Sequence, residues 1–291
     1  MASRTWGGLS AGFWLEAGFN ADDGSGQPTN TNNQASGTPA SIGGAQGLTF
    51  ARRSTVSLVG AWGEVRAGRD FTPQYWGYLG GDPFGNVGVG ASVNYTASIT
   101  GVTNTRASNA LEYFSPTFAG FSANVMHYFG ENASGAATSN DGTGSGIRLA
   151  YANGPFSGGV GYSRTAYAAG DAVQRNIDAQ WDFGVAKVFG DLNRDRVGTV
   201  SAKGGSLGVV VPVGVGQLKA AYSLHRTDAA GNPEAKKLAI GYVYNLSKRT
   251  ASYTTFARVS NNGGSAVALN GAVTAPNGSS DGLDLGIRHT F

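Results

Sequence analysis

Hydrophobic and polar residues alternate along most of the chain with a period of two. In the stretch 175–183, apolar residues such as Ile177 and Trp181 alternate with asparagine, aspartate and glutamine. The stretches 216–226 and 283–291 repeat the pattern. A strict alternation over about nine residues is typical of a β-strand whose two faces meet different surroundings. The sequence therefore predicts a β-rich fold.

Fourteen segments carry this pattern and are expected to be strands. They lie at roughly 8–20, 47–60, 63–70, 106–116, 120–130, 144–152, 155–167, 175–183, 185–193, 204–212, 216–226, 236–245, 250–260 and 282–291. Their connections alternate between tight turns and longer polar loops, the latter at 21–46, 71–105, 131–143, 194–203, 227–235 and 261–281. Short turns at one end and long loops at the other predict an antiparallel up-and-down sheet.

Composition narrows the fold class further. Glycine makes up 47 of the 291 residues, charged residues 13% and aromatic residues 11%. So much glycine destabilises helix interiors, by roughly 0.5–1 kcal/mol for each one. Low charge and abundant aromatic residues argue against a disordered chain, and glycine without a three-residue period excludes collagen.

The polar face of the predicted strands indicates a membrane barrel. This face carries small polar residues and few charges, whereas a soluble sandwich would present surface Lys and Glu. Strands of about ten residues suit a tilted bilayer span, and aromatic residues gather near the strand ends. No run of 18 apolar residues predicts a membrane-spanning helix. We predict an all-β transmembrane barrel forming a single domain over 1–291, with a soluble all-β domain as the alternative.

Charge and chemistry-bearing residues exclude several functions. The net charge of +3 is mild, and basic residues are scattered singly, so nucleic acid is not expected as a partner. The chain has no cysteine, and its three histidines lie far apart, so neither a metal site, a cofactor nor a catalytic triad is expected. The Asp22-Asp23 pair is interpreted as a solvated turn, with a loop cation as the alternative.

Six collinear motifs resemble the general-diffusion porins of the Gram-negative outer membrane, and most of all their small, often anion-selective branch. The motifs are LSAGFWLEAGF at 9–19, LTFARRSTVSLVGAWGEVRAGRD at 48–70, DPFG at 82–85, NALEYFSPTFAGFSANV at 109–125, GYVYNLSKRTASY at 241–253 and LGIRHTF at 285–291. The resemblance covers essentially the whole chain.

The resemblance implies a sixteen-strand barrel that assembles as a homotrimer in the outer membrane, in contact with its lipid. It implies that the loop 71–105 folds inward to narrow the pore, and that small anions and hydrophilic solutes pass through. It also implies that the terminal Phe291 belongs to the assembly signal recognised by the outer-membrane insertion machinery.

The start of the chain departs from the family pattern. It opens near the turn before the third family strand, without a signal peptide or the first β-hairpin, and Arg4 does not match the pore-facing arginine of the missing strand. Fourteen strands plus one hairpin give sixteen, so a truncated gene model or a gene remnant is expected.

Candidate constriction residues follow from the same resemblance. The loop 71–105 contains one charge, Asp82. The family places basic residues on the wall opposite this loop, and the matching positions are Arg52, Arg106, Arg66 and Arg69, with Glu16 as the carboxylate that orients them.

Strand alternation supports Glu16, Arg106 and Arg66 as lumen-facing. It places Arg53 rather than Arg52 inside unless a bulge intervenes, and Arg69 rests on the resemblance alone.

The predicted function is a passive channel with anion preference, because arginine keeps its charge and a narrow passage screens it weakly. The alternatives are a non-conducting structural or adhesive barrel, or a porin fragment that cannot form a normal pore. A barrel enzyme is the third class, and no residue grouping supports it.

Overall fold

The structure, a computed structural model, describes residues 2–20, 23–27, 29–30, 32–34, 41–42, 47–269 and 272–290. Fifteen strands form one antiparallel sheet in chain order, and the short strands β3 and β4 pair separately. The strands are β1 (Ala2–Trp6), β2 (Leu9–Glu16), β3 (Thr29–Asn30), β4 (Ser41–Ile42), β5 (Arg53–Gly60), β6 (Gly63–Phe71), β7 (Arg106–Phe114), β8 (Phe121–Tyr128), β9 (Gly144–Asn153), β10 (Phe156–Thr165), β11 (Ala172–Asp182), β12 (Lys187–Val197), β13 (Val200–Val213), β14 (Gly216–Thr227), β15 (Glu234–Asn245), β16 (Thr250–Asn262) and β17 (Ser279–His289). The predicted all-β antiparallel barrel is confirmed.

All fourteen predicted strands are present, with two differences from the sequence interpretation. The short strand β1 is added and pairs with β2 through a turn at two glycines. The stretch 194–203 was predicted to be a polar loop, which is wrong, because β12 and β13 run through it and pair up to Val197 opposite Val200. Gly198, with φ of 55°, provides the left-handed residue that a tight two-residue turn requires.

The two faces of the sheet differ as the alternation predicts. On β11, Gln174, Asn176 and Asp178 point inward and are buried, whereas Ile177 points outward and is 51% exposed. Large apolar side chains are exposed on the outward face of other strands as well, among them Val56, Leu111, Leu192, Leu207 and Leu285. An apolar exterior around a polar interior is the arrangement of a transmembrane barrel.

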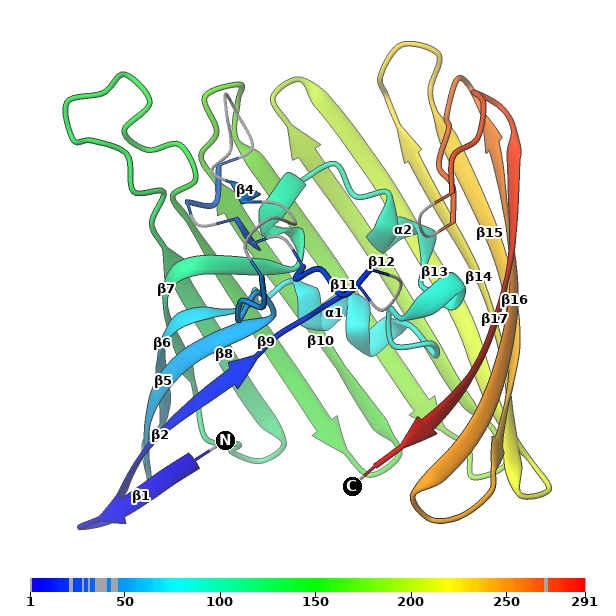
Figure 1. The fold of residues 1–291 in the computed structure, drawn as a ribbon, viewed down its shortest axis with the longest axis horizontal. Coiled ribbons are helices and arrows are strands. Elements are labelled where there is room, and N and C mark those ends of the chain that lie inside the picture. Colours follow the sequence, from blue (N-terminus) through cyan, green and yellow to red (C-terminus); the bar gives the residue numbers. More distant parts are fainter. Residues whose placement is uncertain are drawn as a thin grey trace.

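The sheet curves around an interior, with the long loops and the tight β12–β13 turn at one end and the other short turns at the opposite end (Figure 1). Outward aromatic rings follow one another near the short-turn end at centroid distances of 4.5 to 6.2 Å, in the order Phe121, Tyr151, Phe156, Trp181 and Phe183. Such a row is typical of the aromatic girdle of a barrel. Over the described residues, no ladder joins the two edge strands β1 and β17.

The connection between β6 and β7 lies inside the curve of the sheet (Figure 1). It contains helix α1 (Tyr75–Gly81), the 3-10 turn η1 (Gly88–Gly90), helix α2 (Val93–Thr96) and the 3-10 turn η2 (Gly101–Asn104). Helix α1 packs against β10–β12, α2 against β13 and β14, and η1 against β15–β17. Turn η2 also contacts β7, where the loop returns to the sheet, and the loop faces the inner side of β2, β5 and β6 as the opposing wall.

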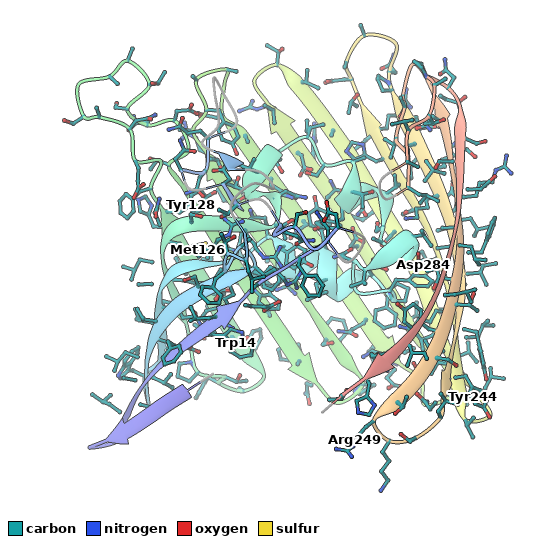
Figure 2. All side chains as sticks on the ribbon, viewed as in Figure 1. Trp14, Met126, Tyr128, Tyr244, Arg249 and Asp284 are labelled. Carbon is teal, nitrogen blue, oxygen red and sulfur yellow. The ribbon has the colours of Figure 1, made fainter. Side chains whose placement is uncertain are left out.

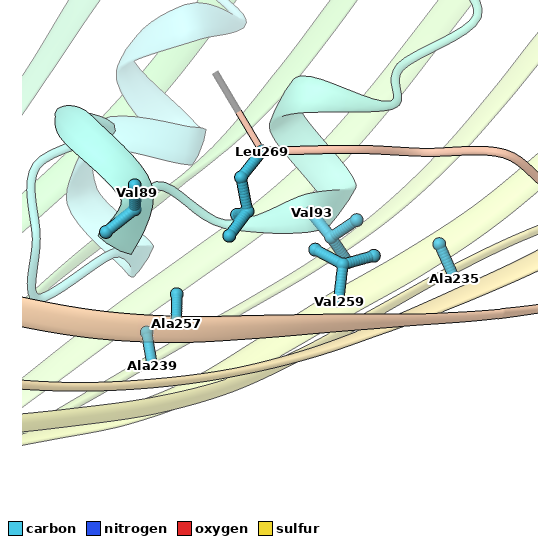
Figure 3. Close-up of a cluster of buried hydrophobic side chains, with 7 residues drawn as sticks. All are labelled: Val89, Val93, Ala235, Ala239, Ala257, Val259 and Leu269. Carbon is cyan, nitrogen blue, oxygen red and sulfur yellow. The ribbon is translucent and has the colours of Figure 1, made fainter. Parts of the chain in front are cut away.

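An apolar cluster fixes part of this loop to the wall (Figure 3). Val89 and Val93 of the loop contact alanine and valine residues of β15 and β16, together with Leu269. Close approach needs small residues on both sides. A Cβ at Gly81 would lie 2.5 Å from Cβ of Asp191, and one at Gly208 would lie 2.5 Å from the ring of Pro83.

Candidate pore constriction

Arg52 and Glu16 come together at the long-loop end of β2. Their side chains form an ion pair, and the Arg52 N–H donates to the Glu16 carbonyl at 3.1 Å. Strand β5 begins one residue later. Arg52 therefore precedes the β2–β5 ladder, and the inward–outward alternation of β5 does not fix the direction of its side chain. No bulge is needed for Arg52 to reach the inward Glu16.

Arg53 lies on the inner face, as the alternation predicts. It stands directly opposite Glu16 in the β2–β5 ladder, and its Nε lies 3.1 Å from the Asp70 carboxylate. Its guanidinium also lies 4.5 Å from the ring centre of Trp14 on β2 (Figure 2). Charges of opposite sign thus alternate across three neighbouring strands, which stabilises the pairing.

Arg66 joins the same network from the middle of β6. It makes a two-pronged ion pair with Glu64, at 2.6 and 3.0 Å, and a further bond of 3.1 Å to Asp70. Its guanidinium covers the ring of Phe114 at 4.1 Å. Two-pronged guanidinium–carboxylate pairs fix geometry as well as charge, so Arg66 is held along the wall.

Arg69 and Arg106 differ from these three arginines, because neither forms an ion pair with a carboxylate in the part of the chain that the structure describes. Arg69 donates to the carbonyls of Ala51 and Asn30 and to the hydroxyl of Ser108, at 2.6, 3.3 and 2.9 Å. These bonds fix the loop before β5 to the wall.

Arg106 begins β7 beside the return of the inward loop. Its Nε donates to the Arg52 carbonyl at 2.8 Å, and its guanidinium lies 4.2 Å from the ring centre of Phe71. The β6–β7 register shifts between Gly68 and Asp70, and Asn109 has φ of 53°. Because of this bulge, the alternation of the later β7 residues does not determine the side on which Arg106 lies. Its hydrogen bond to Arg52 places it beside Arg52 and Glu16.

Aromatic side chains form the facing surface of the loop. Phe71 stacks on Tyr75 at 4.6 Å, and Tyr75 contacts Tyr95 at 5.5 Å. Burial and the neighbouring Tyr95 raise the pKa of Tyr75 to about 12, whereas the charges of Arg106 and Arg52 act to lower it. Tyr75 is therefore a neutral phenol within electrostatic range of the arginines.

Asp82 lies within the loop itself rather than among the arginines. It is 3% exposed and accepts backbone N–H bonds from Phe84, Asn86 and Ser92 at 2.9, 3.0 and 3.1 Å. Burial raises the pKa of Asp82, and the three donors oppose that effect. Its carboxylate thus orders the turn after α1.

Polar side chains on the wall behind the loop form hydrogen bonds that hold the loop in place. Asn176 donates to the Gln74 carbonyl at 2.6 Å, and the Val93 N–H donates to the Ser223 hydroxyl at 2.9 Å. The other such bonds come from Lys219 to the Pro83 carbonyl, from Lys237 to the Ala91 carbonyl, from the Val89 N–H to Asp284 and from Asn94 to Asp191. These lumen charges of β12–β17 are engaged by the loop.

The remaining sequence expectations concern Phe291, the Asp22-Asp23 pair, metal ligands and membrane-spanning helices. Phe291 and Asp22 lie outside the described residues. Asp23 accepts bonds from the N–H and hydroxyl of Ser25 at 2.8 and 2.7 Å. No group of three metal-ligating side chains occurs among the residues described. None of the helices in this part of the chain has the length and hydropathy to cross a bilayer.

Asp70 and Tyr75 were missed by the sequence interpretation, and Arg53 was predicted to face the lumen but was not included among the constriction residues. Arg53 shares its side of β5 with Thr55 and Ser57, so alternation places it inside. Asp70 lies four residues after Arg66 on β6, so both residues point to the same side of the strand. Tyr75 had no such signal, because the loop carries no regular period.

An apolar exterior, a polar interior and an inward loop facing a basic wall define the class of outer-membrane diffusion channels. Comparison with known proteins gives the family: the model of the Gram-negative porins matches residues 5–264. The chain belongs to this family, whose members are channels rather than enzymes, and it resides in the bacterial outer membrane.

Individual relatives of the chain are also outer-membrane porins. Outer membrane porin protein 32 of Delftia acidovorans is 35% identical over 305 aligned residues, which cover 98% of this chain and 81% of the relative. An outer membrane porin of Bordetella pertussis is 28% identical over 71% of this chain and 53% of its own length. The solved anion-selective porin from Comamonas acidovorans superposes with a TM-score of 0.83 at 34% identity, covering 99% of this chain and 87% of its own.

Proposed function

We propose that this channel passes small hydrophilic solutes passively and prefers anions, with the loop 71–105 as its constriction. The observation that carries the proposal is a charge asymmetry. Arg69 and Arg106 have no carboxylate partner among the described residues, whereas the one acid of the facing loop, Asp82, is buried and bound by three N–H groups. The field at the narrowing is therefore positive.

Each wall residue has its own part in this proposal. Arg106 and Arg52 supply the charge that meets a passing anion, and Glu16 orients Arg52 through their ion pair. Arg66 lines the same wall with its charge balanced by Glu64 and Asp70, and Arg69 holds the loop before β5 in place. An arginine keeps its charge at any relevant pH, and its field is less screened in a narrow passage than on an open surface.

The relative solved as an anion-selective porin supports the preference for anions, because it shares 34% of its residues across nearly the whole chain. We further propose a homotrimer embedded in outer-membrane lipid, and Phe291 as the signal for the insertion machinery, on the strength of family membership. If the trimer forms, chemical cross-linking of protein extracted in mild detergent should give bands with the masses of one, two and three chains and none larger.

Planar-bilayer recording tests the proposed function. In an about tenfold KCl gradient, the purified chain should give stepwise conductance with a reversal potential of the anion-selective sign. A cation-selective sign would overturn the charge argument while leaving the pore intact. A folded barrel without conductance steps would instead favour the non-conducting structural barrel.

An engineered disulfide tests the position of the loop. A Cβ at Gly204 of β13 would lie 2.8 Å from Cβ of Asn94 on α2, about an ångström closer than the ~3.8 Å of a disulfide. The natural chain has no cysteine. We therefore expect N94C/G204C to cross-link upon oxidation, with conductance close to that of the unmodified channel.

The matched control is N94C/G190C, because Gly190 precedes the inward Asp191 and thus faces outward. It should not cross-link within one barrel. The measurement is a non-reducing gel after cleavage at one site between the two cysteines, where a disulfide keeps the two fragments together. Equal cross-linking in both pairs, or none in N94C/G204C, would contradict an inward loop.

A further inference from the structure

Four basic side chains form a row on the outward face of the barrel at its long-loop end. Arg175 of β11 stands opposite Arg194 of β12, which stands opposite Lys203 of β13, which stands opposite Arg226 of β14. All four are exposed. With strands about 4.8 Å apart, the row places four positive charges within roughly 15 Å. We call these four residues the cationic row.

The cationic row lacks the acids that accompany its neighbours. Outward basic residues on either side are ion-paired: Arg164 with Asp171, Lys236 with Glu234 at 2.8 Å, and Arg258 with Asp281 at 3.6 Å. No member of the cationic row pairs with a carboxylate in the described part of the chain. Like charges directly opposite each other destabilise a sheet, so the row needs counter-charges from outside the protein.

Three acids and one aromatic ring lie next to the row. Glu234 stands opposite Arg226 in the β14–β15 ladder but is ion-paired with Lys236 at 2.8 Å. Asp195, next to Arg194, is buried on the inner face. Asp228 borders a recess that Arg194, Lys203 and Arg226 also line, and its carboxylate accepts the Ser201 N–H at 2.7 Å. Arg175 lies 5.8 Å from the ring centre of Tyr162, directly opposite it on β10. None of these groups forms an ion pair with a member of the row.

The row lies at the edge of the apolar exterior. One outward step toward the short turns, the cross-strand neighbours are Ile177 and Leu192, which are 51% and 66% exposed. The stretch 175–183 then ends at Phe183 in the aromatic girdle, a length that matches the roughly 9–11 residues of a tilted membrane-spanning strand. The row is therefore at the level of lipid headgroups on the long-loop side.

Two recesses border the row and share Arg194 and Ser201. One of about 410 Å³ is also lined by Lys203, Arg226 and Asp228. The other, of about 300 Å³, is also lined by Arg175, the exposed Arg196 and Asp195. Guanidinium groups bind phosphate through paired N–H donors. Each recess thus offers an anionic headgroup several donors at once.

We propose that the cationic row binds the phosphate groups of an anionic lipid in the leaflet on the long-loop side. A lipid fits better than a free phosphate ion, because exposed Ile177 and Leu192 directly beneath the row would contact its acyl chains. This site is separate from the channel interior, so it does not depend on the proposed selectivity.

Titration with diphosphoryl lipid A in a zwitterionic detergent, followed by native mass spectrometry, tests the site. R194Q/K203Q should weaken binding by roughly tenfold or more, given that each basic residue near an anionic surface contributes a severalfold factor. The matched control K236Q/R258Q also removes one lysine and one arginine from the outward face, but both are already ion-paired. It should bind within about twofold of the natural chain.

Two further measurements, and the comparison of the two variants in the lipid titration, decide the interpretation. Without lipid, R194Q/K203Q should melt no lower than the natural chain, since it removes repulsion between opposed charges; a lower melting temperature would overturn the account of an uncompensated row. Equal loss of lipid binding in both variants, or no loss in either, would overturn the site. Inorganic pyrophosphate that binds as tightly as lipid A would show a free-phosphate site and contradict the lipid.

Discussion

Replacing Arg52 and Arg106 together with glutamine is expected to remove most of the anion preference of the channel. A unit charge about 7 Å from a passing ion contributes about 1–2 kcal/mol at intermediate dielectric constants, which is a roughly five- to thirtyfold change in the permeability ratio. R52Q also leaves Glu16 without its ion-pair partner, and this carboxylate then attracts cations. In an about tenfold KCl gradient, the reversal potential should fall toward zero or change sign.

Charge reversal sharpens the same test. R52E/R106E should give a clearly cation-selective channel with conductance steps of similar size, because the loop and its anchors on β10–β17 are untouched. The control R249Q/R258Q removes two arginines elsewhere: Arg249 lies in the turn at the lower end of the barrel (Figure 2) and Arg258 faces outward. An unchanged reversal potential in R52E/R106E would contradict the arginine filter.

The strands could be predicted from sequence because one physical cause, alternate contact with lipid and lumen, sets their period. The prediction was wrong at 194–203 because residues on both faces are polar there: Asp195 points inward and Arg194 outward. Near the headgroup level the outward face no longer needs apolar residues, so the alternation disappears although the strand continues. The five-residue strand β1 is too short to show a period at all.

The candidate site could be predicted only in part. Alternation indicates the side of Arg66 and Arg53, because both lie within regular ladders. It does not apply to Arg52, which precedes its strand, or to Arg106, which follows a bulge. The resemblance of the motif around residue 52 supplied Arg52, and three-dimensional contacts unite it with Glu16 and Arg106.

Asp82 shows a stricter limit. As the one charge in the loop, it was predicted to line the constriction, but a charge count gives no direction for a side chain in an aperiodic segment. The sequence does not indicate that three backbone N–H groups bind its carboxylate, because the folded loop brings them together. Its interaction with the backbone leads to a different expected phenotype.

D82A is expected to disorder the constriction without altering its charge preference. The substitution leaves the N–H groups of Phe84, Asn86 and Ser92 without their acceptor, at a cost of roughly 1–3 kcal/mol for each one that stays buried. The turn between α1 and α2 should then leave its position, and single-channel records should show larger, noisier conductance steps. The reversal potential should change little, because the lost charge does not face the lumen.

The control D182A removes an acceptor of the same kind in a different setting. Asp182 accepts the Gly184 N–H at 2.8 Å in an exposed turn at the short-turn end, where water replaces the lost bond. It should conduct like the natural channel. If D82A instead kept quiet steps and became markedly more anion-selective, the carboxylate would be acting across the pore, and its role in ordering the loop would be contradicted.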